Sequence, residues 1–190
     1  MDFTLAGKYF YRLYKSSLCD LYINAFSQKP ASQYHSRQKT QRYLDSVFNR
    51  GFGVFAISEH RLCGALLAVP LSFDKNLPKK ISANYEVEMS LYIAEMMVDE
   101  LFRGQGIGHE LIIKFLKEVN TNCFSHVVIR VWDQNIPAIK LYEKMGFKPI
   151  ASIIQPVLKV DKSEMMDFRK IYMVKEIKVK INGAADYEHN

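Results

Sequence analysis

The chain has 190 residues, 48% of them hydrophobic and 24% charged, and a formal net charge of +6 at pH 7. A chain of this length and composition fits one globular domain, which excludes a globally disordered protein. It contains no run of the roughly 20 apolar residues that a membrane helix needs and no recognisable export or lipidation signal. We therefore expect a cytoplasmic protein that does not insert into a membrane.

The excess of positive charge does not by itself indicate a nucleic-acid-binding protein. Lys and Arg are spread through the first 50 residues without the dense block that tracks phosphates. The three cysteines, Cys19, Cys63 and Cys123, lie far apart and have no histidine at zinc spacing. We predict reduced, buried thiols, no metal site and no nucleic-acid partner.

The first half of the chain predicts a strand, two helices and a hairpin. Gly51 is expected to end the second helix, and Glu59-His60-Arg61 separates two β-rich runs that read as the hairpin. In chain order the expected elements are a strand at residues 8–14, helices at 16–26 and 37–48, and strands at 52–58 and 62–71.

The second half of the chain alternates strands and helices. Residues 126–132 (HVVIRVW) are almost continuously apolar, which indicates a strand that is covered on both faces. The other expected elements are a loop at 73–84, strands at 85–98, 151–160 and 170–178, and helices at 107–120 and 136–145. The order βααβββαβαββ predicts an α/β fold with a mixed sheet, as one domain over residues 1–180 followed by a short tail at 181–190.

A glycine-rich turn, Arg103-Gly104-Gln105-Gly106-Ile107-Gly108, joins a predicted strand to a predicted helix. The first N–H groups of a helix lack internal partners and carry partial positive charge, so they can bind an anion, and glycines let a phosphate approach closely. The turn lacks the Lys-Ser/Thr of a P-loop, and its GxGxG spacing departs from the dinucleotide fingerprint. Glycine turns before helices are common, so this turn alone is weak evidence.

Two motifs together resemble the GNAT superfamily of N-acetyltransferases. The turn at Arg103–Gly108 meets that superfamily's acetyl-CoA signature, Q/R-x-x-G-x-G/A, and Asn135–Phe147 resembles its helix N-x-x-A-x-x-x-Y-x-x-x-G-F. The motifs appear in the expected order, with a helix and a strand between them. The resemblance extends from about Tyr9 to Lys178, and it implies the GNAT acyl-CoA N-acyltransferase fold with acetyl-CoA as co-substrate and no metal.

The resemblance also implies which residues bind acetyl-CoA. The turn amides would hold the pyrophosphate, the backbone of strand 85–98 would pair with the pantetheine arm, and the start of helix 136–145 would contact the same arm. The implied cofactor-binding residues are Met97, Val98, Arg103, Gly104, Gln105, Gly106, Ile107, Gly108, Asn135 and Ala138. From the residues alone, Asn135 could instead be only a helix N-cap, and Arg103 could be only a surface side chain.

Two catalytic residues are expected. Tyr142 matches the superfamily tyrosine that can protonate the departing thiolate, although it could also be a core aromatic on its helical stripe. Glu95 lies three residues before Val98 and is a candidate base for the amine, provided that strand alternation does not turn it away from the cleft. Arg130 stands where ribosomal-protein N-acetyltransferases of the superfamily carry a glutamate base, which argues against that subfamily.

We therefore predict transfer of an acetyl group from acetyl-CoA to a primary amine by direct attack, in a monomer or homodimer. The alternatives are a non-catalytic acyl-CoA-binding regulatory module and, less supported, a nucleotide-binding protein. Glu86, Glu88, Glu95, Asp99 and Glu100 concentrate negative charge, which favours a cationic or amine-bearing acceptor. The acceptor itself depends on the loops at 28–36, 73–84 and 156–167, which carry no recognised signature.

Overall fold

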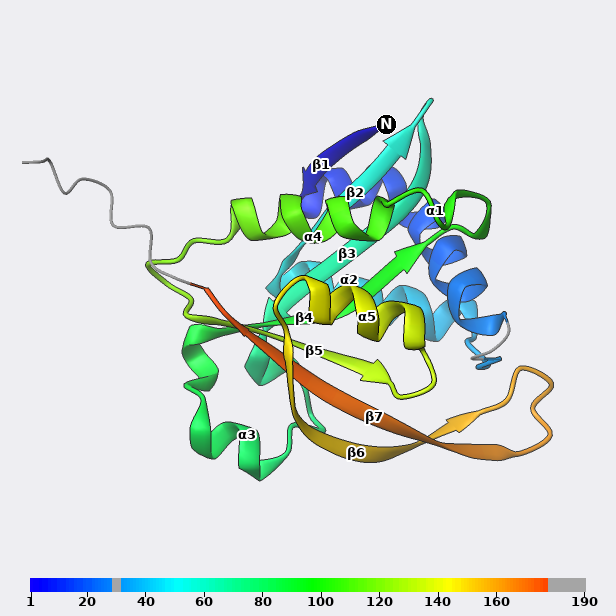
Figure 1. Ribbon diagram of the computed structural model, residues 1–190. Helices are drawn as coiled ribbons and strands as arrows, with labels where there is room; N and C mark the ends of the chain where they lie inside the picture. Colours follow the sequence, from blue (N-terminus) through cyan, green and yellow to red (C-terminus); the bar gives the residue numbers. More distant parts are fainter. Residues whose placement is uncertain (29–31, 178–190) are drawn as a thin grey trace, which may run out of the picture.

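The computed structural model describes residues 1–28 and 32–177, and it consists of a seven-stranded mixed sheet with helices on both faces (Figure 1). The strands lie in the order β1-β2-β3-β4-β5-β7-β6, and β4 and β5 pair in parallel whereas the other described pairs are antiparallel. The elements are β1 (Asp2–Ala6), α1 (Lys8–Ser27), α2 (Arg37–Arg50), β2 (Phe52–Ser58), β3 (Arg61–Pro70), α3 (Lys79–Asn84), β4 (Ser90–Val98), α4 (Ile107–Glu118), β5 (His126–Trp132), α5 (Ile136–Lys144), β6 (Lys148–Leu158) and β7 (Met165–Glu176).

The predicted order of strands and helices is confirmed, with the short helix α3 added. The position of the first strand was wrong, because residues 8–14 begin helix α1 and the strand is Asp2–Ala6. Packing overrode the strand preference of the aromatic side chains there. Tyr11 is buried and stacks on Phe48 at 4.2 Å between ring centroids, whereas Tyr9 points to solvent and is 75% exposed.

The segment before β4 also differs from the prediction. Residues 79–84 form helix α3 instead of a loop, and the strand begins at Ser90 instead of residue 85. A turn replaces the first part of the predicted strand, because the Ser90 hydroxyl and the Met89 amide both donate to the Glu86 carbonyl, at 2.7 and 3.1 Å. The predicted end of the last strand at Lys178 and the tail at 181–190 lie outside the described residues.

Two apolar clusters hold the helices on the sheet. In Figure 1, α4 and α5 lie on one face and α1 and α2 on the other. Val128 of β5 belongs to the cluster under α1 and α2, whereas Val127 and Ile129 belong to the cluster under α4 and α5. β5 is therefore buried on both faces, as its continuous apolar sequence predicts.

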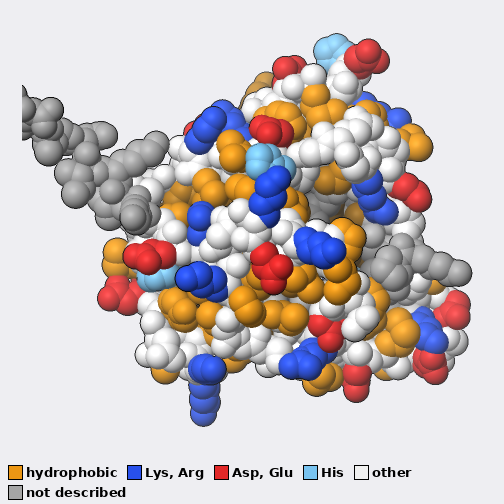
Figure 2. Space-filling model, viewed as in Figure 1, with side chains coloured by type: hydrophobic (Ala, Val, Ile, Leu, Met, Phe, Trp, Pro, Cys, Tyr) orange, Lys and Arg blue, Asp and Glu red, His pale blue; other side chains and the backbone are white. Residues whose placement is uncertain are grey.

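The surface charge is mixed, and two of the three cysteines are buried as expected. Figure 2 shows Lys and Arg side chains scattered among acidic and apolar ones on the face that carries α4 and α5. Cys19 and Cys63 are buried free thiols, but Cys123 is exposed, so the prediction of burial was wrong for that residue. Within the described residues, no cluster of His, Cys, Asp or Glu could hold a metal ion. None of the helices described there combines the length and apolar character needed to cross a bilayer.

Candidate active site

A cleft opens where β4 and β5 separate. The two strands pair only from Ser90–His126 to Ile93–Ile129 within the described residues, and their later residues diverge. A β-bulge accompanies the divergence, because Leu67 of β3 is opposite Glu95 and Ala68 is opposite Ile93, so that Ala94 is the extra residue. The cleft has a volume of about 490 Å³, and residues 93–98 and 129–132 line it together with parts of α1, α5 and the β6–β7 hairpin.

The glycine-rich turn lies at the end of β4, beside this cleft. Gly104 and Gly106 have φ of +76° and +80°, which side-chain-bearing residues rarely adopt, and a Cβ on either would meet no atom within 4 Å. Gly106 begins α4 without a side-chain cap, so the first amides of that helix face outward without an internal partner. The turn therefore offers open space and free N–H groups to an anion.

Gly108 has a different role from the other two glycines. A Cβ at this position would lie 3.1 Å from Leu141 Cδ2, so the glycine lets α4 approach α5 closely. Ile107 is 4% exposed and packs in the core under α4, so only its backbone could face a ligand. Gln105 is exposed, and its side chain donates to the Leu101 carbonyl at 3.3 Å.

Arg103 lies at the rim of the cleft. Its Nε donates to the Val98 carbonyl at 3.2 Å and its guanidinium also donates to Gln28 Oε1 at 3.2 Å. Met97 and Val98 line the cleft from β4, although the Met97 side chain is buried under α1 and α2. Their backbone would therefore make any contact with a ligand, on the strand edge that β5 has left.

Asn135 and Ala138 lie at the start of α5. Asn135 lines the cleft and is the N-cap, since its side-chain oxygen accepts from the Ala138 amide at 3.4 Å. Both sequence interpretations of Asn135 are thus compatible with its position. The Ala138 side chain packs against the core under α4 and α5 and is not among the residues that line the cleft.

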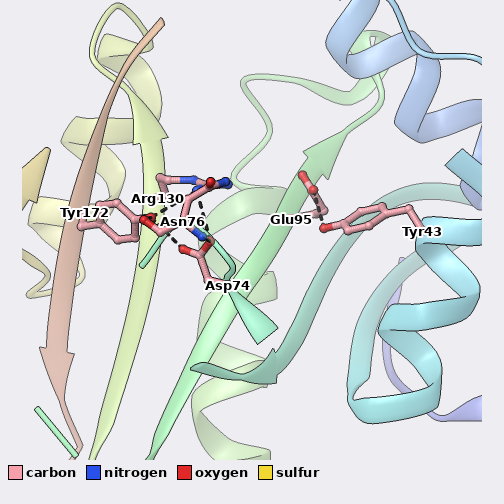
Figure 3. Close-up of polar contacts among 6 residues, drawn as sticks. All are labelled: Tyr43, Asp74, Asn76, Glu95, Arg130 and Tyr172. Carbon is pink, nitrogen blue, oxygen red and sulfur yellow. Dashed lines mark hydrogen bonds and ion pairs between the residues drawn. The ribbon is translucent and has the colours of Figure 1, made fainter. Parts of the chain in front are cut away.

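Tyr142 and Glu95, the two predicted catalytic residues, both line the cleft. Tyr142 is 4% exposed, and burial raises the pKa of its hydroxyl, with a further contribution from the nearby Glu95 carboxylate. The Tyr43 hydroxyl donates to Glu95 Oε1 at 2.7 Å (Figure 3). Burial raises the pKa of Glu95 to about 7, against the opposing effects of the Tyr43 hydrogen bond, Arg130 and Lys170.

The bulge explains why Glu95 points into the cleft. Simple alternation along β4 would place Glu95 on the same face as Ile93, under α4 and α5. The extra residue Ala94 reverses the alternation, so Glu95 instead reaches Tyr43 on α2. Sequence reasoning did not identify Tyr43, because it lies far away in the sequence and no local motif contains it.

Arg130 belongs to a polar cluster in the wall of the cleft. Its guanidinium donates to the Tyr172 hydroxyl at 3.1 Å and to Asp74 Oδ1 at 3.3 Å, and the Tyr172 hydroxyl donates to Asp74 Oδ2 at 2.7 Å (Figure 3). The Asp74 side chain is only 3% exposed, so this carboxylate neutralises Arg130 away from solvent. Arg130 therefore keeps its charge and joins the segment after β3 to the sheet.

The predicted concentration of negative charge at the cleft was wrong. Glu86 and Glu88 are exposed beside the turn that precedes β4, at the opposite end of this strand from the glycine-rich turn. Asp99 pairs with Arg61 at 2.7 Å and lines, with Glu100, a neighbouring pocket beside α1. Of the acidic residues in that stretch, Glu95 lines the main cleft, and its charged neighbours there are Arg103, Arg130 and Lys170.

Comparison with known proteins identifies the relatives of this chain. The profile of the Acetyltransferase (GNAT) family matches residues 15–147, which is more than half of the chain. The human N-acetylaspartate synthetase is 25% identical over 143 residues, which cover 73% of this chain and 47% of that protein. The chain thus spans about half the length of the curated relative that it matches.

Solved structures share the fold. The ribosomal-protein-alanine N-acetyltransferase from Brucella melitensis superposes with a TM-score of 0.69 at 17% identity, covering 93% of this chain and 100% of that one. The yncA protein from Salmonella typhimurium, solved with its cofactor acetyl-CoA, has a TM-score of 0.68 at 12% identity, covering 97% of this chain and 99% of that one. At these identities the similarity establishes the fold alone.

Proposed function

Because this chain belongs to the GNAT acetyltransferase family, whose members use acetyl-CoA, we propose that it transfers the acetyl group to a primary amine by direct attack. The observation that carries this proposal is the position of Glu95 and Tyr142 in one cleft, beside a strand edge and an anion-binding turn. The name of the human relative, N-acetylaspartate synthetase, describes the formation of an N-acetylated product and so also supports an amine acceptor.

The chain's own groups fit the binding of acetyl-CoA. The open amides at the start of α4 and the guanidinium of Arg103 would hold the pyrophosphate. The edge of β4 that β5 leaves free, at Met97 and Val98, would pair with the pantetheine arm in the manner of an added strand. Asn135 would contact the same arm through the part of its amide that does not cap α5.

The proposed reaction uses one proton acceptor and one proton donor. Glu95, with a pKa of about 7, would take a proton from the ammonium form of the acceptor and so release the free amine. The amine nitrogen then forms a bond to the thioester carbonyl carbon, and the carbon–sulfur bond breaks. Tyr142, whose raised pKa keeps its hydroxyl protonated, would give its proton to the departing thiolate, and the second proton that the nitrogen loses as the amide forms would restore the Tyr142 hydroxyl.

The alternative, a non-catalytic acyl-CoA-binding module, would keep the turn and the β4 edge without a working base. The position of Glu95 favours the enzyme, because its carboxylate is held by Tyr43 and lines the cleft at a pKa suited to proton transfer near neutral pH. A regulatory module has no evident use for a buried carboxylate at that position.

Two measurements test the proposal. Coenzyme A, but not ATP or NAD, should raise the melting temperature of the protein, which would exclude a nucleotide-binding protein. A panel of primary amines incubated with enzyme and acetyl-CoA should then release free thiol with at least one amine. Stabilisation by coenzyme A without thiol release from any amine would contradict the enzyme and favour the regulatory module.

A further inference from the structure

One wall of the cleft comes from elements that contain neither of the two GNAT motifs. The segment between α1 and α2 contributes Gln33 and His35, and the β6–β7 hairpin contributes Gln155 and Lys170. This wall belongs to the same cleft as the Glu95 carboxylate, and Glu95 and Lys170 each shift the pKa of the other. It is therefore where an acceptor would lie with its amine near the base.

Lys170 is a half-buried cation with no carboxylate partner among the described residues. The described residues form ion pairs elsewhere, but none of them involves Lys170, and its ammonium lies 5.1 Å from the centre of the Phe168 ring. Phe168 is in turn stacked on Trp132, at 4.2 Å between centroids. Burial lowers the pKa of Lys170 to about 8, which reflects the unfavourable transfer of an unpaired ammonium away from water.

His35 is a second group that lacks a partner beside the same space. Its Nε2 atom is buried and has no hydrogen-bond partner among the described residues, while its ring packs edge-on against Tyr22 at 5.0 Å. Burial lowers the pKa of His35, and the charge of Lys170, which lines the same cleft, lowers it further. Buried polar atoms without partners are uncommon in folded proteins, and the cleft that His35 lines is where a partner could bind.

A cation that lines the cleft from β5 is already neutralised. Arg130 is paired with Asp74 and hydrogen-bonded to Tyr172, so its charge is balanced within the protein. Arg103 lies at the rim, beside the anion-binding turn. Lys170 is therefore the cation near Glu95 whose charge remains to be balanced by a ligand.

Backbone hydrogen bonds join the two segments that form this wall. The Tyr34 amide donates to the Leu158 carbonyl at 2.8 Å, the Val160 amide donates to the Ser32 carbonyl at 2.7 Å, and Gln33 forms a β-bridge with Lys159. This bridge ties the segment after α1 to the β6–β7 hairpin. The joined segments thus form a continuous wall on this side of the cleft.

We propose that the acceptor is a small amine that also carries a carboxylate, and that Lys170 binds this carboxylate with His35 as a second hydrogen-bonding group. The inference rests on the proposed function, since it names the substrate class of the same site. An amino acid has both groups in one molecule: its ammonium is attracted to Glu95 and its carboxylate to Lys170. The opposite charges of Glu95 and Lys170 thus match the two ends of the acceptor.

The first test uses the wild-type enzyme and amines matched in everything but the carboxylate. Thiol release would be measured with free amino acids, with the corresponding amino acid amides and with the decarboxylated amines. We expect kcat/KM to be at least about tenfold higher for the amino acids, because a charge-assisted hydrogen bond contributes roughly 1.5 to 3 kcal/mol. Equal or faster acetylation of the amides and decarboxylated amines would overturn the inference and leave the proposed function intact.

The second test assigns the contact to Lys170. Lys170→Met should raise the KM for the amino acid about tenfold or more, with the KM for acetyl-CoA nearly unchanged and little effect on the decarboxylated amine. Lys148→Met, at an exposed position of β6 outside the cleft, is the matched control and should change neither KM. Lys170→Arg should restore part of the affinity.

Loss of activity with both amines to the same extent in Lys170→Met would overturn the role of Lys170 as the carboxylate ligand. If that variant folds poorly, Lys170→Gln provides the same comparison with a smaller change in polarity. Binding of coenzyme A without thiol release from any amine, with or without a carboxylate, would instead contradict the proposed function and this inference with it.

Discussion

The two sides of the cleft are built in different ways. The side beside α4 and α5 consists mainly of backbone: the amides of a glycine turn, the free edge of β4 and the capped start of α5. The opposite side consists of side chains from distant parts of the chain, among them Tyr22 from α1 and Lys170 from β7. The first side would hold acetyl-CoA, and the second would select the acceptor.

This difference explains why the motifs resemble those of a large family while the acceptor side resembles none. A backbone site needs glycines at fixed positions, because only glycine readily adopts the positive φ of Gly104 and Gly106. A side-chain site can be formed by many residue types on a conserved scaffold, so its composition can change with the acceptor. Three substitutions test this division, beginning with the one expected to have the largest effect.

Tyr142→Phe tests the proposed role of the Tyr142 hydroxyl as the proton donor to the departing thiolate. Loss of the hydroxyl should lower kcat by roughly 10²- to 10⁴-fold with acetyl-CoA affinity nearly unchanged, because a general acid contributes that much to rate and the ring still packs. Steady-state kinetics and calorimetry measure the two quantities. Tyr11→Phe is the control, since Tyr11 is equally buried at 4% exposure but bonds Asp45 outside the cleft, and it should alter stability and leave kcat unchanged. A Tyr142→Phe enzyme that retained about half its kcat would show that Tyr142 is a packing residue and not the general acid.

Gly106→Glu tests the backbone side. The new side chain would occupy the open space beside the turn amides, and its carboxylate would repel the pyrophosphate, so acetyl-CoA should bind about 100-fold more weakly. Gly106→Ala is the control, because it introduces the same strain at φ +80° without the charge or the bulk. A bulky residue at Gly108 is a poorer test, since it would also separate α4 from α5. Equal affinity of the Glu and Ala variants for acetyl-CoA, in calorimetry, would refute the phosphate role of the turn.

The pH dependence of the wild-type rate tests Glu95. A base must be deprotonated to accept the proton, and burial raises the pKa of Glu95 to about 7, so kcat/KM should rise about tenfold between pH 6 and pH 8. Glu95→Gln should lower the rate and remove its rise with pH. Glu86→Gln, at an exposed position outside the cleft, should keep the wild-type rate and its rise with pH. A Glu95→Gln enzyme with the same pH profile as the wild type would assign the proton transfer to another group.

The same pKa shift has a consequence for stability. The folded-state pKa of Glu95 lies above its ordinary value. The free energy of unfolding is therefore highest at acidic pH with respect to this group, and it falls as pH rises from about 4.5 to about 7. Glu95→Gln removes the buried charge, so this variant should unfold at a higher temperature than the wild type at pH 8 and lose that advantage at pH 4. A catalytic group that destabilises the fold when it is charged is typical of active sites.

The sequence alone was sufficient for much of the fold and for the backbone side of the cleft. The strand and helix order, the doubly covered strand β5, the N-cap at Asn135 and the glycine turn all depend on local properties: periodicity, capping and positive φ. Where an aromatic run suits either a strand or a helix, as at residues 8–14, these local properties were not enough, and packing of Tyr11 on Phe48 decided the outcome.

The direction of each cleft side chain depended on the tertiary structure. Glu95 could be placed near the site from its distance to Val98, but its orientation follows from a bulge, which arises from the register between β3 and β4 and has no local signature. The acidic stretch misled for the same reason, because charges that are close in sequence are distributed along a strand and its flanking turns. Tyr43 reaches Glu95, and His35 and Lys170 line the same cleft, only after elements far apart in the chain pack together. Backbone geometry is set by neighbouring residues, whereas the contacts of a side chain are set by the whole fold.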